Sequence, residues 1–485
     1  MEYRDLRDWI GAVRDMGELR DVSGATWEED IGRVTEMLHH TDDSPAVLFD
    51  DIPGYPRGFR ILANANATRR RLALTLGLPL DIERRPLMDE FLARTESSRA
   101  IPPRVVKDGP VMENVLTGDK VDVLKFPSPK WHPLDGGRYL GTGVVDILKD
   151  PDSDWVNLGT YRVMVHDSKR VAVYISPGKH GRQFRDAYFK RKEPCPIAIV
   201  VGGDPLLFIA STLEIPQGIS EYDWAGGIRG EAFDVIIDPV TKLPIPASAE
   251  IVLTGFLHHD KMAPEGPFGE WTGYYASGER EEPVLEVQAI YHRNDPIILG
   301  VPPNKPPYEP HRYREYLRSA LLLRELKAAG VPGVSDAHCF GVGGCRLLNV
   351  VSIEQRYAGH ARQAGHVAAL CRVGAYLGRM IVVVDDDIDV TDLDDVMWAV
   401  LTRSDPVESF DIIKRAWSGP LDPRIHPDLK GHNSRVIIDA TRPWEWRDRF
   451  PIAIGPDAET KRETRKRWGH LLAPQPAPKK EKAAR

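Results

Sequence analysis

Cysteine is scarce in this sequence, and its pattern argues against two kinds of stabilised domain. The 485 residues contain four cysteines, and no two of them form a C-x-x-C pair. A disulfide framework needs a denser set, and a structural zinc site needs paired cysteines. We therefore expect reduced thiols and a cytoplasmic protein. The four cysteines are Cys195, Cys339, Cys345 and Cys371.

Long apolar runs and an excess of positive charge are also missing. No stretch of 18 or more apolar residues occurs, so we expect no membrane-spanning helix. The opening residues, M-E-Y-R-D-L, lack the basic and apolar regions of a secretory signal. A net charge of −7 argues against a general binder of nucleic acid or anionic membranes.

The length predicts several domains, because 485 residues exceed what one hydrophobic core usually supports. We predict an N-terminal α/β segment over 1–107, with helices at 6–16 and 87–95 and a strand at 46–49. The pattern T-W-E-E at 26–29 has the form of a capping box that opens another helix. The predicted buried face of that helix is Ile31, Val34, Met37 and Leu38.

Residues 108–308 are rich in short β-prone runs separated by Gly, Pro and Asp turns. This texture indicates a barrel or sandwich rather than a βαβ array. A linker over 309–330 with a long helix at 313–329 follows two Pro-Pro pairs that resemble a hinge. The predicted strands are 142–148, 161–166, 171–175, 197–201, 233–237, 250–257, 284–291 and 297–301.

Residues 331–455 alternate strands and helices, which predicts an α/β domain. Residues 456–485 form a C-terminal tail, and we expect its Pro/Lys-rich end from Pro474 to be disordered. The fold class is therefore a multidomain α+β protein. The elements predicted in the third domain are strands at 347–352 and 380–384 and helices at 360–377 and 392–403.

The segment E-G-P-F-G-E at 265–270 places two carboxylates five residues apart. Glycine and proline break helices, so we predict a turn or loop. On a regular strand these two positions would face opposite sides, so only an irregular path lets Glu265 and Glu270 converge. Converging carboxyl groups suit a site where one stays protonated and the other stays charged. Taken alone, the segment is more often a surface turn with solvated glutamates.

Three further segments supply candidate ligands for an anion or a metal. N-L-G-T-Y-R at 157–162 places Asn157 and Arg162 where a strand begins, and arginine grips a carboxylate with two parallel hydrogen bonds. His180 lies in a glycine-flanked loop, and Glu221 follows a turn. An amide oxygen, an imidazole and a carboxylate suit Mn²⁺ or Mg²⁺ bridging to a phosphate. Spacing alone does not show that these residues meet.

Six stretches follow one another along the chain: N-L-G-T-Y-R, P-G-K-H, I-S-E-Y-D-W-A-G-G-I-R-G, E-G-P-F-G-E-W-T-G-Y, V-V-V-D-D-D-I-D and R-V-I-I-D-A-T. In this order they resemble the UbiD family of reversible decarboxylases, which use prenylated flavin mononucleotide (FMN). Each stretch is weak alone, but the six in family order cover most of the chain and are together specific. The resemblance implies a central split β-barrel that binds the flavin, a linker helix, and a C-terminal α/β domain through which relatives form dimers.

The resemblance also implies catalytic roles for three residues of this chain. Arg162, Glu265 and Glu270 match the family's catalytic Arg-Glu-Glu set. Arg162 would orient the substrate carboxylate, and Glu265 would stay ionised beside it. Glu270 would deliver a proton to the carbon that loses CO₂, for which its pKa must be raised by burial or a neighbouring carboxylate.

Other residues match the family's cofactor site. Asn157, His180 and Glu221 match the ligands of a divalent metal, Mn²⁺ or Mg²⁺, that holds the cofactor phosphate, and K⁺ is commonly held beside the flavin edge. Arg379 falls where the family often has a basic residue, commonly lysine, facing the phosphate. Some relatives have glutamine in place of Lys179. The residues implied to contact the flavin are Asn157, Thr160, Tyr161, Arg162, Lys179, His180, Ser211, Thr212, Leu213, Glu221 and Arg379.

We therefore expect a reversible non-oxidative decarboxylase of an aromatic, heteroaromatic or other α,β-unsaturated carboxylic acid. Loss of CO₂ from an unsaturated carbon leaves a carbanion that side chains cannot stabilise, so a cofactor must act as the electron sink. A flavin prenyltransferase of the UbiX type would supply the cofactor, and the protein would form a homodimer or a higher homo-oligomer. The alternatives are a metal-dependent hydrolase built on His180 and the acids, and a catalytically silent protein that binds flavin or a partner.

Three other features are assigned no catalytic or metal-binding role. The acidic run D-D-D-I-D at 385–389 ends a strand, and we interpret it as capping, turn and subunit contacts, with Thr391 as the N-cap of the next helix. The run G-V-G-G at 341–344 lacks the Lys-Ser/Thr of a phosphate-binding loop. His338, with Cys339 and Cys345 nearby, is assigned to local packing.

Overall fold

The computed structural model describes residues 3–97, 100–275, 278–419, 421–429, 431–455 and 458–472, and the chain divides into two units. The first unit is Met1–Thr441, and the second is Arg442–Arg485, which includes α12 (Ala458–Leu472). The tail end that the sequence predicts to be disordered lies outside the described residues. Within those ranges, no helix is both long and apolar enough to cross a membrane.

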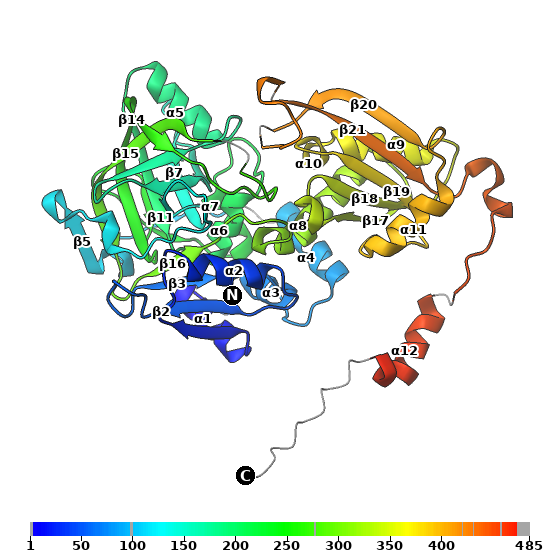
Figure 1. The fold of residues 1–485 in the computed structure, drawn as a ribbon, viewed down its shortest axis with the longest axis horizontal. Helices are drawn as coiled ribbons and strands as arrows, with labels where there is room; N and C mark the ends of the chain where they lie inside the picture. The colour runs from blue at the N-terminus through cyan, green and yellow to red at the C-terminus, as the bar shows by residue number, and fades with distance from the viewer. Residues whose placement is uncertain are drawn as a thin grey trace, which may run out of the picture. The chain divides into compact units, whose positions relative to one another are not determined.

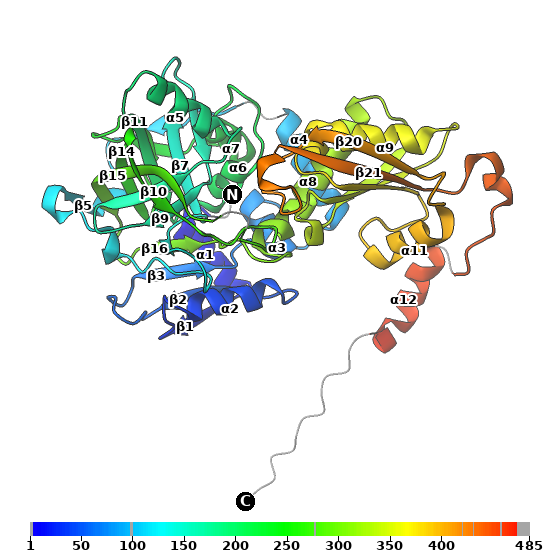
Figure 2. The same ribbon diagram turned by 45° about the horizontal axis from the view of Figure 1, so that its top comes forward.

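The N-terminal part of the first unit is a four-stranded sheet in the order β1-β2-β3-β16 (Figures 1 and 2). Its last strand, β16 (Ile297–Gly300), comes from far along the chain and pairs in parallel with β3. A segment predicted within the central domain thus completes the N-terminal sheet. The other elements are α1 (Leu6–Asp15), β1 (Leu19–Ser23), α2 (Asp30–His39), β2 (Ala46–Asp50), β3 (Arg60–Ala63), α3 (Arg69–Leu76) and α4 (Arg84–Ser97).

The buried face of α2 differs from the predicted one. Val34 and Met37, predicted to be buried, are 37% and 71% exposed. The helix instead buries Ile31, Thr35 and His39, which follow one another at intervals of four residues. Two polar groups on this face have partners inside the protein, because Thr35 Oγ1 donates to the Ile31 carbonyl and His39 Nδ1 accepts from an asparagine side chain. Apolarity alone therefore misplaces the face.

The start of α2 also differs from the predicted capping box. The hydroxyl and the backbone amide of Thr26 both donate to the Asp30 carboxylate, at 2.7 and 2.9 Å. Glu29 provides no side-chain cap, and the helix begins at Asp30 rather than directly after Thr26. An aspartate inside the first turn thus takes the place of the expected glutamate.

The central part of the first unit is a long sheet that curls into a half-barrel (Figures 1 and 2). Its order is β6-β9-β10-β15-β14-β11-β7-β8, with β5 also paired to β15. β14 (Ile251–Glu265) and β15 (Arg280–His292) are much longer than the predicted strands 250–257 and 284–291. Their hairpin carries the chain directly into the segment that holds the candidate acids.

Packing on both sides explains the apolar strands of this sheet. In β7 (Val144–Lys149), Val144 and Leu148 belong to one core cluster, while Val145 and Ile147 belong to another. The remaining elements are β4 (Arg104–Val105), β5 (Asn114–Thr117), β6 (Arg138–Tyr139), β8 (Val156–Gly159), β9 (Arg162–Val165), β10 (Arg170–Tyr174), α5 (His180–Lys190), β11 (Cys195–Val201), α6 (Pro205–Thr212), α7 (Glu221–Arg229), β12 (Asp234–Ile237) and β13 (Pro244–Pro246).

The C-terminal part of the first unit is a five-stranded sheet in the order β17-β18-β19-β21-β20, entered through the long helix α8 (Glu309–Ala328). The helix predicted over 360–377 is interrupted, because α9 (His360–Leu370) ends before Cys371 and the short α10 (Arg372–Ala375) follows. The remaining elements are β17 (Val334–Cys339), β18 (Leu348–Ile353), β19 (Met380–Asp385), α11 (Leu393–Arg403), β20 (Phe410–Trp417) and β21 (His432–Ala440).

The sequence predicts Thr391 as the N-cap of α11, but in the structure the N-cap is Asp392. The Asp392 carboxylate accepts from two backbone amides of the first turn, whereas the Thr391 hydroxyl bonds Asp389. A carboxylate that reaches two amides satisfies more of the unpaired helix donors than one hydroxyl does. In the preceding acidic run, Asp385 and Asp387 form ion pairs with Arg403, a structural role.

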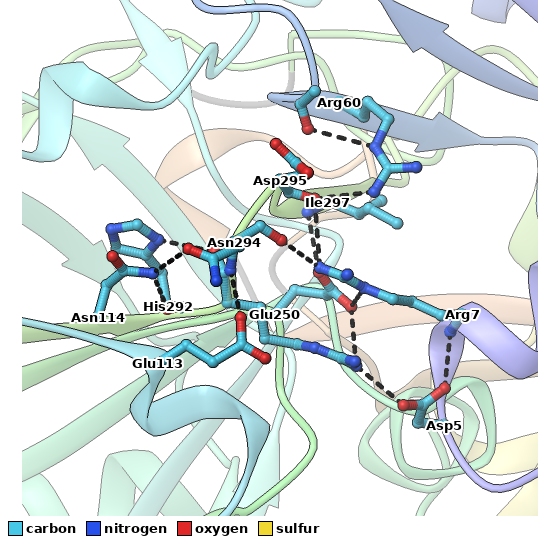
Figure 3. Close-up of polar contacts among 12 residues, drawn as sticks. Asp5, Arg7, Arg60, Glu113, Asn114, Glu250, His292, Asn294, Asp295 and Ile297 are labelled. Atoms are coloured by element: carbon cyan, nitrogen blue, oxygen red, sulfur yellow. Dashed lines mark hydrogen bonds and ion pairs between the residues drawn. The ribbon is translucent and has the colours of Figure 1, made fainter.

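An ion pair between a partly exposed arginine and a buried glutamate joins the N-terminal and central parts of the first unit (Figure 3). Arg7 of α1 donates from Nε and Nη2 to the two carboxylate oxygens of Glu250, at 2.9 and 2.8 Å. Arg293 reaches the same carboxylate at 3.3 Å, and the Ile297 amide donates to it at 3.2 Å. The Glu250 side chain is completely buried, so these donors replace its lost hydration. Because β16 begins at Ile297, the pair fixes the start of that strand.

Candidate active site

A cavity of about 440 Å³ lies between the central and C-terminal parts of the first unit. Its volume is in the usual range of ligand-binding pockets. The central part contributes the β8–β9 connection, the starts of α5 and α7 and the end of α6, while the C-terminal part contributes Arg346, Tyr376 and Trp417. The predicted site residues that line it are Asn157, Thr160, Tyr161, Arg162, Lys179, His180, Ser211, Thr212, Leu213, Glu221 and Glu270.

Arg162 bridges the two predicted acids. Its Nη2 donates to Glu265 Oε2 at 2.8 Å, and its Nη1 donates to Glu270 Oε1 at 3.4 Å. All three side chains are buried, and that of Glu265 is completely so. Arg162 and Glu270 face the cavity, whereas Glu265 is not among its lining residues and supports Arg162 from behind. The two acids therefore converge on one guanidinium.

A strand end followed by a glycine turn brings the acids together. Glu265 is the last residue of β14 rather than part of the predicted loop, and Gly266 follows with a φ of +93°. Glycine adopts that conformation without the strain that a Cβ imposes. A neighbouring loop also approaches closely, because a Cβ on Gly136 would lie 1.9 Å from the Gly266 carbonyl oxygen. Glycine is therefore required at both positions of this path.

Aromatic and cationic side chains surround Glu265 and Arg162. The Tyr139 hydroxyl donates to Glu265 Oε1 at 3.1 Å, and burial, reinforced by that carboxylate, raises the pKa of Tyr139, so the phenol keeps its proton. Arg280 Nε lies 3.8 Å from Glu265 Oε2. The Tyr174 ring has the Arg162 and Arg280 guanidinium carbons 4.2 and 3.9 Å from its centroid. These contacts hold the Arg162 fork in a single orientation.

The electrostatic surroundings of Glu270 favour its protonated form. Burial raises the pKa of Glu270, the Glu265 carboxylate raises it further, and Arg162 opposes both effects without cancelling them. A raised pKa lets a carboxyl group keep its proton to higher pH and donate it to a reacting carbon. Glu270 combines this shift with a position on the cavity wall.

Asn157 and Glu221 meet in the cavity wall, as a shared ligand site requires. Asn157 Nδ2 donates to Glu221 Oε1 at 2.9 Å, and the Leu158 amide donates to Oε2 at 2.7 Å. Burial raises the pKa of Glu221 to about 7, and among the described residues no cation pairs with it. A buried carboxylate with only amide donors fits a divalent cation, which would supply the missing positive charge.

His180 lines the same cavity, but within the described part of the chain it makes no hydrogen bond to Asn157 or Glu221. It is the first residue of α5 rather than part of a loop, and its ring meets Trp155 edge-on at 4.8 Å between centroids. Burial and the nearby Lys179 lower the pKa of His180, which leaves the imidazole neutral, the form that binds metals.

Hydroxyl groups at the end of α6 line another side of the cavity. Thr160 Oγ1 and Ser211 Oγ are 2.7 Å apart, and Thr212 Oγ1 lies 3.1 Å from the Tyr313 hydroxyl. Leu213, the C-cap of α6, follows them in the wall. The predicted flavin-edge segment thus presents two hydroxyl groups and one apolar side chain to the cavity.

Basic residues that sequence reasoning missed supply positive charge to the cavity. Arg346, Arg314 and Arg372 line it together with the predicted Lys179. Lys179 is accessible from the cavity, yet the surrounding protein displaces bulk water, and this desolvation, with the neighbouring guanidinium groups, lowers its pKa. Glu214 pairs with Arg346 at 2.6 Å. These three arginines lie in α8 and in the C-terminal part, so no local sequence motif predicts that they reach the cavity.

Arg379 lies apart from these basic residues. Its side chain is bonded to the buried Asp422, and it is not among the residues that line the cavity.

His338 is buried, which lowers its pKa to about 3, and it packs against Phe340. In the described part of the chain, no group of three His, Cys, Asp or Glu side chains is placed to hold a metal. The Asn157 set differs from such a group by its amide ligand.

Three consecutive segments of the chain match one family of known proteins. Residues 10–90, 104–306 and 311–440 match the N-terminal, Rift-related and C-terminal domains of 3-octaprenyl-4-hydroxybenzoate carboxy-lyase, UbiD. A protein of Archaeoglobus fulgidus is 33% identical and covers 97% of this chain and 99% of its own length. The pyrrole-2-carboxylic acid decarboxylase of Pseudomonas aeruginosa is 30% identical over 90% of this chain and 91% of its own.

Solved structures of UbiD-class enzymes share the fold. HmfF from Pelotomaculum thermopropionicum, in complex with FMN, has a TM-score of 0.83 at 28% identity, covering 94% of this chain and 98% of its own. Vanillic acid decarboxylase from Sedimentibacter hydroxybenzoicus, in its open form, has a TM-score of 0.84 at 28% identity, covering 97% and 100%. The chain belongs to the UbiD family and is a carboxy-lyase of that family.

Proposed function

We propose that this protein is a reversible, prenylated-FMN-dependent decarboxylase of an aromatic, heteroaromatic or other α,β-unsaturated carboxylic acid. The observation that carries the proposal is a buried Glu270–Arg162–Glu265 set on the wall of the cavity that also contains Asn157 and Glu221. A proton donor, a carboxylate-binding guanidinium and a candidate cation site thus share one enclosed space.

The cofactor proposal rests on the composition of the cavity wall. Prenylated FMN, when bound, supplies the electron sink that side chains lack. Asn157, His180 and Glu221 would hold Mn²⁺ or Mg²⁺ against its phosphate, and Arg346 and Lys179 add positive charge nearby. Thr160, Tyr161, Ser211, Thr212 and Leu213 would line the flavin, with K⁺ beside them. Arg379 has the weakest support, because Asp422 already pairs with it.

The protein's share of the chemistry follows from the geometry of the acids. Arg162 presents two N–H groups in one plane, which suits the two oxygens of a substrate carboxylate. Glu265, buried behind it, compensates the guanidinium charge and leaves Glu270 as the acid that keeps its proton. Glu270 delivers that proton to the carbon from which CO₂ departs, and in carboxylation it takes the proton back.

The substrate class is inferred from the apolar surfaces near Glu270. Tyr174, Trp271, Tyr308, Tyr376 and Trp417 line the cavity together with prolines. Flat aromatic walls favour a flat, conjugated acid over a saturated one. Two of these residues come from the C-terminal part, so a small movement between the two parts would exclude water from the site.

The proposed organisation assigns flavin binding to residues 108–308, a linker helix to 309–330 and self-association to 331–455. In support of self-association, α11 exposes Met397, Trp398 and Leu401. Apolar stripes of this kind on helices commonly mark protein–protein contacts. We propose a homodimer or higher homo-oligomer in the cytoplasm.

The test is production of the protein with and without a UbiX-like flavin prenyltransferase. Purified protein from the co-expressing cells is expected to release prenylated FMN and to decarboxylate an acid from a panel that includes pyrrole-2-carboxylate and vanillate. Protein made without the prenyltransferase should be nearly inactive. Full turnover by a verified flavin-free sample would refute the proposal, and turnover with metal alone by a colourless sample would favour a hydrolase.

A further inference from the structure

A buried polar relay runs from the end of α2 to the residue that precedes Glu270. It consists of His39, Asn304, His132 and Asp135, and none of the four lines the cavity. His39, Asn304 and Asp135 are buried, and the His132 side chain is 15% exposed. The relay joins three segments that are distant in the sequence: α2, the segment that precedes α8, and the loop before β6.

Asp135 ties this relay to the segment that carries the acids. Its Oδ1 accepts from the Gly269 amide at 3.1 Å, and its Oδ2 accepts from the His132 amide at 2.9 Å. One residue further, the Gly136 amide donates to the Pro267 carbonyl at 2.8 Å. The position of Glu270 relative to Arg162 therefore depends on how the loop at 131–136 is held.

The partners of His132 determine its protonation. Asn304 Nδ2 lies 2.7 Å from His39 Nδ1, and burial lowers the pKa of His39 to about 3, so the ring is neutral, and with the amide in this orientation Nδ1 accepts. The remaining atom of the amide, Oδ1, faces His132 Nε2 and needs a donor there. His132 Nδ1 lies 3.3 Å from Asp135 Oδ2, a carboxylate oxygen that can accept from a protonated ring nitrogen in addition to the His132 amide. An imidazolium, with a proton on each ring nitrogen, donates to both oxygens, so this geometry favours the charged ring.

The charges around His132 agree with this assignment. Burial opposes the charged form, but the bonds to Asp135 and Asn304 outweigh it and raise the pKa of His132, with Glu36 of α2 adding to the effect. The rings of Phe268 and Tyr275 meet the imidazole edge-on at 6.5 and 6.4 Å between centroids. The titratable groups on the elements around it are Asp135, Glu36, His39, His40, Tyr275 and Arg312.

We propose that His132 is a positioning residue for Glu270: as an imidazolium it holds Asp135 against the Gly269 amide. Its second hydrogen bond, to Asn304, connects it to the segment that precedes α8. The inference rests on the proposed role of Glu270 as proton donor. Because the pKa of His132 is raised, its charged form is complete below its ordinary value of about 6.5 and is lost as the pH rises through the folded-state pKa. A neutral ring supplies one proton for two acceptors, so the segment around Gly269 loosens.

The experiment is hydrogen–deuterium exchange of the full-length, flavin-loaded protein between pH 6 and pH 9, corrected for intrinsic exchange rates. In the wild type, we expect exchange at 267–271 to become about ten-fold faster across this range, the factor that loss of one charge-assisted hydrogen bond implies. In His132→Gln, exchange should be fast and independent of pH. His259→Gln, at an exposed histidine, is the control and should behave as the wild type.

Two outcomes would overturn the inference. One is slow, wild-type exchange at 267–271 in His132→Gln at every pH, and the other is a wild type whose exchange there does not change with pH. If His132→Gln fails to fold, Asp135→Asn decides instead: it should move the loosening to lower pH, and an unmoved transition contradicts the role of His132. Exchange needs no turnover, so failure of the proposed decarboxylase activity would be seen separately.

Discussion

Replacing Glu265 by glutamine tests how the protein separates the roles of its two acids. Glu265 is completely buried, accepts from Arg162 at 2.8 Å and lies 3.8 Å from Arg280. Removal of one partner from a buried ion pair costs about 3–5 kcal/mol of unfolding free energy, because the other charge stays uncompensated. Arg162 keeps a second carboxyl, Glu270, at 3.4 Å, so we expect the lower end, about 3 kcal/mol.

The same substitution changes the acid that remains. The Glu265 carboxylate raises the pKa of Glu270, and Arg162 lowers it. Without Glu265 the first effect disappears and Arg162 turns wholly to Glu270, so the pKa of Glu270 must fall. A proton donor works below its folded-state pKa and is lost above it, so the alkaline limb of kcat should move to lower pH. At pH 7 we expect turnover to fall by about 10²-fold.

The assay is kcat against pH for flavin-loaded wild type and variant, with urea unfolding for the stability term. Glu282→Gln is the matched control, because Glu282 is also largely buried and lies 3.9 Å from Arg280 but does not contact Arg162. It should leave the alkaline limb in place. An alkaline limb that stays put or moves to higher pH in Glu265→Gln would refute this reasoning.

Three further substitutions have definite expected outcomes. Arg162→Lys should lose turnover although the charge remains, because an ammonium cannot make the planar two-point contact, while flavin absorbance stays normal. His180→Ala should lower the flavin retained after gel filtration, and full occupancy would contradict its assignment to the metal. Arg7→Leu should lower the unfolding free energy by about 3 kcal/mol, since buried Glu250 loses its two-point partner. Arg4→Leu, at an exposed pair, should change it by less than about 1 kcal/mol and serves as the control.

Much of the domain organisation could be predicted because it depends on local sequence patterns. Short β-prone runs with Gly/Pro turns mark the central sheet, and alternating runs mark the C-terminal sheet. The family motifs identified residues that the structure gathers around one cavity, although they lie as far apart as Asn157 and Glu270. The order of the motifs along the chain indicates which residues belong to one site, whereas a single residue does not.

The features that could not be predicted depend on tertiary contacts. The buried face of α2 includes His39 because the distant Asn304 forms a hydrogen bond with it. The spacing of apolar residues in the helix cannot indicate such a bond. Arg346 reaches the cavity from the C-terminal part and pairs with Glu214, a contact between residues 132 positions apart. His132 reads in the sequence as one more loop histidine. Only its buried partners distinguish it.

The most direct test of the central claim is the delivery of a proton by Glu270. Decarboxylation of an accepted acid in D₂O by the flavin-loaded enzyme should place deuterium on the carbon that lost CO₂. In Glu270→Gln, which keeps the shape of the side chain but has no acidic proton, the rate of labelling should fall by about 10²-fold or more. Labelling at the wild-type rate in Glu270→Gln, with loss of labelling in Glu265→Gln, would contradict the claim and assign the proton to Glu265.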